Sequence, residues 1–156
     1  MKITKLIIFI ALWSLCLSGC GQKGLLVQES KSPNPTGLRQ LLTVGPAKVN
    51  VEVRNTPSGR ELGLSYRQTL GKDEGILFVF ETTAPYGFWM KGMAFPLDLV
   101  WISEGKVVQL SEQVPAPKAG EEPVVVRPKK MVDQVLEVNA GWVAKQGVRV
   151  GDGISF

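Results

Sequence analysis

The stretch Gly75–Ile102, GILFVFETTAPYGFWMKGMAFPLDLVWI, is the most apolar part of the chain beyond the N-terminal twenty residues. It holds two of the four tryptophans and four of the six phenylalanines. Ile76–Phe80 is a continuous apolar run, typical of a strand that is buried on both faces. Pro96 lacks a backbone donor and marks the start of a second strand, Leu97–Ile102. The stretch therefore predicts two core strands and a shaped corner, Phe88–Asp98, between them.

Shorter elements surround these two strands. Val49–Val53 alternates apolar and polar residues, the pattern of a half-buried strand. Thr56 and Pro57 are typical of a helix start, and we expect that helix to run to about Leu64. The turn at Ser103–Lys106 indicates a hairpin. Asn139 is expected to cap a second short helix that Gly147 closes. The remaining expected elements are strands at Val107–Val114, Val135–Val138 and Val148–Phe156, the helix Ala140–Gln146, and an irregular excursion, Pro115–Lys130, interrupted by Val124–Val126.

The element pattern predicts one domain, at residues 46–156. Its strands are connected by short segments, and only two short helices are expected. The fold class is therefore mainly β: a small β-sandwich or jelly-roll-like barrel with one or two short helices.

Composition narrows the chemistry of that domain. The chain has no histidine, and its two cysteines, Cys16 and Cys20, both precede the domain. Histidine-dependent nucleophiles, histidine metal sites and a disulfide framework are thereby excluded there. We expect no metal and no cofactor. Without Lys2 and Lys5, 16 basic residues stand against 14 acidic ones, so no nucleic-acid partner is expected.

The N-terminus has the features of a targeting signal. Two lysines precede Leu6–Leu17, an apolar run that is too short for an ordinary membrane span and suits a signal peptide. The following Leu17-Ser18-Gly19-Cys20 resembles the lipobox of bacterial lipoproteins. That resemblance implies cleavage after residue 19, acylation of Cys20 and anchoring to a membrane. The alternative is a plain secretory signal that ends near a cysteine.

The segment after Cys20 suggests a destination. Gly21, in place of an aspartate, resembles lipoproteins that are sent to the outer membrane, so the periplasmic face of that membrane is favoured over the inner membrane. Cys20–Leu26 also resembles, over seven residues, the start of small lipoproteins associated with lipopolysaccharide transport. Residues 20–45 are rich in Ser, Pro and Gly toward the domain and are expected to form a flexible tether.

Six short motifs follow one another along the domain: Gly63-Leu64-x-Tyr66-Arg67, Gly75–Phe80, Phe88–Lys91, Pro96-Leu97-Asp98, Val135–Gly141 and Gly151-Asp152. In this order and spacing they resemble the bacterial and archaeal domain of unknown function 192 family. Ser65, Ile76 and Gly92 depart from the family's usual residues. The resemblance covers about residues 49–156 and implies a compact, mainly β fold whose biochemical role is not established.

The corner carries the first candidate site. Lys91 and Asp98 are expected to form a buried ion pair, which would either act as acid and base or fix the strand register. Trp89, with Phe88 and Met93, would line a groove there or pack in the core. A glycan, a lipid or an envelope protein is the expected occupant.

Carboxylates form the second candidate site. Asp98 and Glu137 would be the pair that a carboxylate-based hydrolase needs. Alternatively, Glu137 would pair with Arg60 or Arg67.

Three functions remain open. The first is a membrane-tethered cell-envelope lipoprotein whose domain is a binding or accessory module. The second is a carboxylate-based envelope hydrolase. The third is a structural partner of outer-membrane assembly that docks through its lipidated N-terminus. The first is preferred, and the corner residues would carry it.

Overall fold

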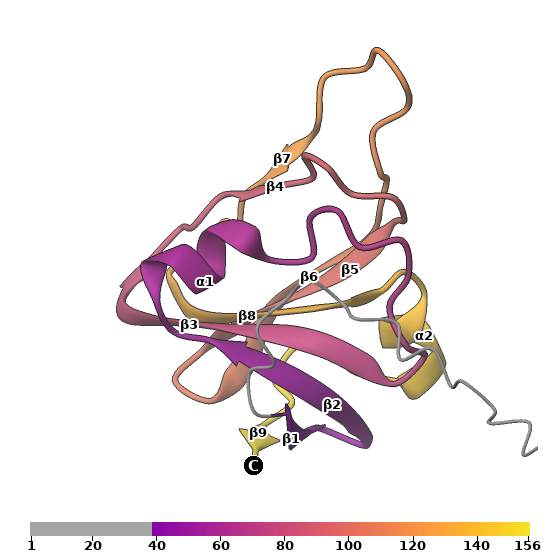
Figure 1. Cartoon of the computed structure of the whole chain (residues 1–156). Helices are drawn as coiled ribbons and strands as arrows, with labels where there is room; N and C mark the ends of the chain where they lie inside the picture. The colour runs from indigo at the N-terminus through magenta and orange to yellow at the C-terminus, as the bar shows by residue number, and fades with distance from the viewer. Residues whose placement is uncertain (1–38) are drawn as a thin grey trace, which may run out of the picture. The chain divides into compact units, whose positions relative to one another are not determined.

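The computed structural model describes residues 39–156, and the expected signal peptide, Cys20 and most of the tether lie outside this range. The fold is mainly β with two short helices, as the sequence predicted (Figure 1). The elements are β1 (Arg39–Val44), β2 (Ala47–Arg54), α1 (Pro57–Leu62), β3 (Glu74–Ala84), β4 (Phe88–Trp89), β5 (Leu97–Ser103), β6 (Lys106–Val114), β7 (Val125–Val126), β8 (Val132–Asn139), α2 (Trp142–Gln146) and β9 (Ile154–Ser155).

Seven strands form one sheet in the order β6-β5-β8-β3-β2-β1-β9, and β4 pairs with β7 separately. All pairs in the large sheet are antiparallel except β2 with β3, which α1 and the loop after it connect. The edge strand β6 meets the C-terminal segment, since Lys106 bridges Gly153 and the Val107 amide donates to the Asp152 carbonyl at 2.8 Å. The sheet is therefore curled into a half-barrel.

Alternation along the strands gives the sheet two buried faces. Leu77 of β3, Val100 of β5 and Leu136 of β8 belong to a core inside the curl, closed by Trp142 and Val143 of α2. The outer faces of the same strands belong to a second core, which α1 with its following loop, β4 and β7 cover (Figure 1). Every residue from Leu97 to Ile102 is fully buried as a result, as expected for a core strand.

Local signals placed several elements correctly. The Thr56 side chain accepts a hydrogen bond from the Gly59 amide at 3.2 Å, with Pro57 in the first turn of α1. The β5–β6 hairpin turns at Glu104 and Gly105, both with positive φ. At Gly75 a Cβ would lie 2.7 Å from the Glu137 carbonyl, so only glycine lets β3 and β8 approach here.

Three expectations about boundaries were wrong. The tether was expected to reach residue 45, but β1 pairs with β2 from Arg39. The side chains of Leu42 and Val44 are buried in the core, which favours a strand here. The strand expected at Ile76–Phe80 is longer than predicted, since β3 continues through residues 81–84 past a register shift. Of the expected strand at 148–156, only Ile154 and Ser155 form a strand, β9, and Gly153 makes a single bridge to Lys106, because Gly151 and Asp152 turn the chain.

The cap of α2 also differs from the prediction. Asn139 ends β8, and its side-chain amide donates to the carbonyls of Leu70 and Gly71. Gly141, in the left-handed conformation, holds the N-cap position and has no side chain to offer. The carboxylate of Asp98 takes the place of the missing side-chain cap, since Asp98 Oδ2 accepts a hydrogen bond from the Val143 amide at 2.9 Å.

Asp98 has a second backbone partner. The β5–β6 ladder has a bulge beside Asp98, where Gln113 takes a φ of 53°. The Gln113 amide donates to Asp98 Oδ1 at 2.8 Å. One fully buried carboxylate thus holds both the bulge and the start of α2, which identifies Asp98 as a structural residue.

Charged groups gather around Glu52 on β2. Arg67 donates to both of its carboxylate oxygens, at 3.0 and 2.8 Å, and Arg54 donates at 2.8 Å. Arg39 lies 3.6 Å away and also pairs with Glu74. Burial alone would raise the pKa of Glu52, but the hydrogen bond from Arg67 and the nearby guanidinium charges outweigh it and lower the pKa below 4.5.

Glu52→Gln is expected to lower the free energy of unfolding by about 2 kcal/mol at pH 7, because it leaves buried guanidinium groups without their countercharge. The stabilisation by Glu52 is present above the unfolded-state pKa and is lost as the pH falls through the lowered folded-state value. The gap between wild type and variant should therefore close below about pH 4. Urea unfolding from pH 3 to 7 measures it, with the exposed Glu112→Gln as the control. An unchanged gap at low pH would contradict the charge effect.

Candidate binding cleft

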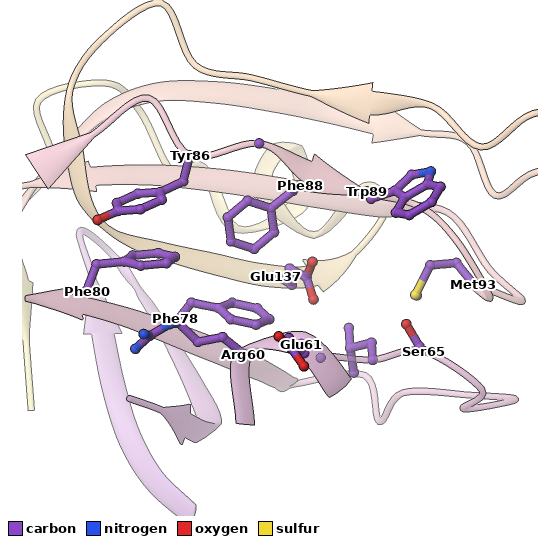
Figure 2. Close-up of a pocket in the computed structure, with 13 residues that line it drawn as sticks. Arg60, Glu61, Ser65, Phe78, Phe80, Tyr86, Phe88, Trp89, Met93 and Glu137 are labelled. Carbon is purple, nitrogen blue, oxygen red and sulfur yellow. The ribbon is translucent and has the colours of Figure 1, made fainter. Parts of the chain in front are cut away.

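A cleft of about 370 Å³ opens over the outer face of the sheet (Figure 2). Its walls come from α1 and the following loop, from β3, from β8 and from the segment around β4. These elements are far apart in the sequence, and the pairing of β3 with β8 brings them together. The lining residues are Arg60, Glu61, Gly63, Leu64, Ser65, Phe78, Phe80, Tyr86, Gly87, Phe88, Trp89, Met93 and Glu137.

Aromatic rings form most of the wall. Phe88 packs edge-on against Phe78, with ring centroids 4.9 Å apart, and against Phe80 at 6.4 Å. Phe80 stacks on Tyr86 at 3.6 Å, and the Tyr86 hydroxyl donates to the Thr82 carbonyl at 2.7 Å. This packing fixes the rings, so the cleft is preformed.

Glu137 lies in the middle of these rings (Figure 2). Alternation along β8 turns its side chain to the outer face, where it is only 7% exposed. Its Oε2 has no hydrogen-bond partner among the residues that the structure describes. Burial without a countercharge raises the pKa of Glu137 from 4.5 to about 8. At neutral pH this carboxyl is therefore mainly protonated.

The charged groups at the mouth of the cleft come from α1. Arg60 donates to the carbonyls of Asn55 and Val79, at 2.7 and 3.0 Å, and its Cζ lies 5.1 Å from the centre of the Phe80 ring. Glu61 is exposed beside it. No salt bridge joins Arg60 to Glu137 within residues 39–156.

Trp89 forms the opposite end of the cleft and is 55% exposed. Lys91 Nζ lies 4.8 Å from the centre of the Trp89 ring, in a cation–π contact. Lys91 itself lines a neighbouring hollow of about 260 Å³, to which Trp89 also contributes.

The expected ion pair between Lys91 and Asp98 was wrong. Lys91 is exposed on Trp89, whereas Asp98 is buried inside the curl with both oxygens bonded to backbone amides. The strand register places them on different sides, because the side chain of Asp98 points to the inner core.

The carboxylate pair of Asp98 and Glu137 does not form either. Leu99 is the register partner of Glu137, and Val138 is that of Asp98. Because neighbouring residues on a strand point to opposite faces, the two carboxyl groups lie on opposite faces of the sheet. The expected pairing of Glu137 with an arginine was wrong as well, since Arg67 binds Glu52 and Arg60 binds carbonyls.

The structure thus gathers three of the predicted site residues, Arg60, Trp89 and Glu137, in one cleft. Sequence reasoning missed Phe78, Phe80, Tyr86 and Glu61 as lining residues. The alternation of Phe78 and Phe80 on one face of β3 was the available signal, but the apolar run around them hid it.

Two searches of the described residues, 39–156, returned nothing. No helix in this range is long and apolar enough to cross a membrane. No group of three or more carboxylate or other ligand side chains in the same range is arranged to hold a metal ion.

Comparison with known proteins supports the family assignment. The model of the family DUF192, described as an uncharacterized ACR, matches residues 40–156. No curated protein matches the chain. A solved protein of Sinorhizobium meliloti 1021, provisionally described as a transcription regulator, is 32% identical with a TM-score of 0.70, and the match covers 78% of this chain and 96% of that one. A protein of unknown function from Novosphingobium aromaticivorans DSM 12444 shares the fold, with 24% identity, a TM-score of 0.67 and coverage of 76% and 85%.

Proposed function

The chain belongs to the DUF192 family, and from this premise we propose that it is a membrane-tethered lipoprotein of the cell envelope whose domain binds a ligand in the Glu137 cleft. The lipobox-like Leu17–Cys20 supports the tether and the envelope location. The outer membrane is the proposed destination, because Gly21 follows Cys20.

One observation carries the binding function: a preformed aromatic cleft encloses a buried carboxyl group whose Oε2 has no hydrogen-bond partner within residues 39–156. Buried polar groups in proteins are nearly always hydrogen-bonded. A titratable group of shifted pKa in an apolar cleft is, moreover, a common mark of a functional site. The other two buried carboxylates of the sheet are bonded: Asp98 accepts from two backbone amides, and Glu52 accepts from Arg67 and Arg54.

The binding function is tested by thermal unfolding of residues 39–156 with peptidoglycan fragments, oligosaccharides and lipopolysaccharide. This range holds both cores, and the S. meliloti chain shows that a protein of this extent folds without further domains. A ligand at 100 times its dissociation constant adds about 2.7 kcal/mol, which raises the midpoint by several degrees. Trp89→Ala should reduce the shift, because the Trp89 ring lines the cleft. The variant should still fold, because the ring is exposed and supports no core.

Met131→Ala is the matched control, since Met131 is equally exposed and lies outside the cleft. A shift that survives Trp89→Ala unchanged would place the ligand elsewhere. No shift with any of these components would count against an envelope ligand in the cleft and would favour docking through Cys20–Leu26, the third function.

A carboxylate-based hydrolase is the second candidate, with a different pair of acids from the one expected. Glu61 and Glu137 both line the cleft. Glu137, kept protonated by burial, suits a general acid, and the exposed Glu61 would supply the second carboxylate. Release of product from the same envelope components, abolished by both Glu137→Gln and Glu61→Gln, would favour hydrolysis over binding alone.

A further inference from the structure

Cations of the chain itself lie against aromatic rings at both ends of the cleft. Arg60 contacts Phe80 at one end (Figure 2). Lys91 contacts Trp89 at the other end. Each contact shows that a ring of this wall attracts positive charge. Between the two ends stands Glu137, and no basic side chain of residues 39–156 makes an ion pair with it.

The middle of the cleft therefore has the features of a cation-binding site, and no basic side chain of residues 39–156 forms an ion pair with Glu137 there. Phe78 and Phe88 flank the carboxyl group of Glu137, which is more than nine-tenths buried. Its Oε2 has no hydrogen-bond partner in the described part of the chain. An aromatic wall around a carboxylate is a known arrangement for organic ammonium groups. A volume of about 370 Å³ suits a small molecule.

We propose that the middle of the cleft binds the ammonium group of a small organic amine, with its charge against Glu137 and its apolar stem against Phe78 and Phe88. This inference rests on the proposed function of the cleft as a binding site. It adds the class of ligand.

The other charged and titratable groups that face the cleft are consistent with this class. Arg60 and Glu61 face it from α1, and Tyr86 faces it from the segment before β4. The charges of Arg60 and Glu61 offset each other at the mouth. β3 contributes only phenylalanines to the lining, and Glu137 is the contribution of β8. Arg60 lies at the Phe80 end of the cleft, with Nη1 bonded to two carbonyls, whereas the middle of the cleft presents the carboxyl of Glu137.

Binding of an ammonium group is expected to release a proton. The carboxyl of Glu137 is mainly protonated in the free protein at pH 7, and an adjacent positive charge favours its ionised form. The affinity for an amine should then rise with pH, by up to tenfold per unit below about pH 8, and level off above it. A neutral ligand that accepts a hydrogen bond from the protonated carboxyl would show the opposite dependence.

The test is calorimetric titration of residues 39–156 with hexylammonium and with its neutral counterpart, 1-hexanol. Buffers of different ionisation enthalpy report the protons released. Hexylammonium should bind at least tenfold more tightly than hexanol at pH 8 and should release close to one proton at pH 7. Glu137→Gln should lose at least tenfold in amine affinity and all proton release, whereas the distant Glu112→Gln should match wild type.

The wild-type comparison requires no variant to fold. Equal binding of both compounds without proton release would overturn the amine inference while keeping the cleft as a binding site. The same conclusion would follow if hexylammonium did not bind while an envelope component gave a thermal shift that depends on Trp89. Failure of every compound in both experiments would refute the binding function itself.

Discussion

Asp98→Ala is expected to lower the free energy of unfolding by about 3–5 kcal/mol, because it leaves one buried and one part-buried amide without an acceptor. These amides belong to Gln113, at the bulge of β6, and to Val143, in the first turn of α2. Each unsatisfied group costs roughly 1–3 kcal/mol, and the carboxylate bonds are stronger than neutral ones. Urea unfolding at pH 7 measures the loss.

Two further variants make this result specific. Asp98→Asn keeps one acceptor oxygen and turns an NH2 group toward the other amide, so its loss should be intermediate in size. Asp152→Ala removes a carboxylate that accepts one exposed amide, that of Arg149, and should cost about 1 kcal/mol. A loss below 1 kcal/mol for Asp98→Ala would contradict the structural role and would reopen a functional one.

The role of Asp98 shows what the sequence could and could not predict. Its burial was predictable, since Leu97, Leu99 and Trp101 alternate with Val100 and Ile102 along β5. Its partners were not, because Gln113 and Val143 lie 15 and 45 residues away and depend on a bulge and a helix start. Asn139 was the obvious local cap for α2, but β8 continues through it, so the cap comes from another strand.

Local chemistry accounts for most of the correct predictions. Thr56 caps α1 through its side-chain hydrogen bond, and Pro57 favours the first helical turn through its fixed φ. Pro96 comes just before β5, because it has no backbone N–H to donate to the sheet. Pairing over distance accounts for most of the errors. Leu42 and Val44 belong to a strand only because β2 turns back on them, and the Ser, Pro and Gly residues before them favoured a tether.

The sequence indicated several residues of the candidate site but did not indicate which of them lie next to one another. Trp89, Arg60 and Glu137 were singled out separately, but the sequence offers no register that would place Glu137 between Phe78 and Phe88. One simple rule would have separated Glu137 from Asp98: once β5 and β8 pair, the two carboxyl groups are on opposite faces. Asp98 and Arg67 are thereby identified as structural, whereas the buried Glu137 has an Oε2 without a hydrogen-bond partner among the described residues.

Glu137→Gln is expected to make the domain more stable than wild type at pH 8 and to have little such advantage at pH 4. The pKa of Glu137 is raised to about 8 in the folded protein, from an ordinary value of 4.5. Below 4.5 both folded and unfolded states hold the proton, so the wild-type side chain carries no ionisation penalty. Between 4.5 and 8 the unfolded chain ionises first, and the stability of wild type relative to the variant falls by roughly 1.4 kcal/mol per pH unit. Above pH 8 the difference should stay constant, at several kcal/mol.

The measurement is urea unfolding of wild type and Glu137→Gln from pH 4 to 9, with Glu112→Gln as a control that should run parallel to wild type. The acid-side effect of Glu52 is common to all three proteins and cancels in the difference. A pH-independent gap would mean that Glu137 titrates normally and is solvated, and would remove the basis for an amine-linked proton. A gap that opens between pH 5 and 8 would mean that the fold keeps a destabilising carboxyl at this position. Since a buried glutamine, or an apolar residue, would cost the fold less, such a gap indicates that Glu137 serves the ligand of the cleft and not the stability of the sheet.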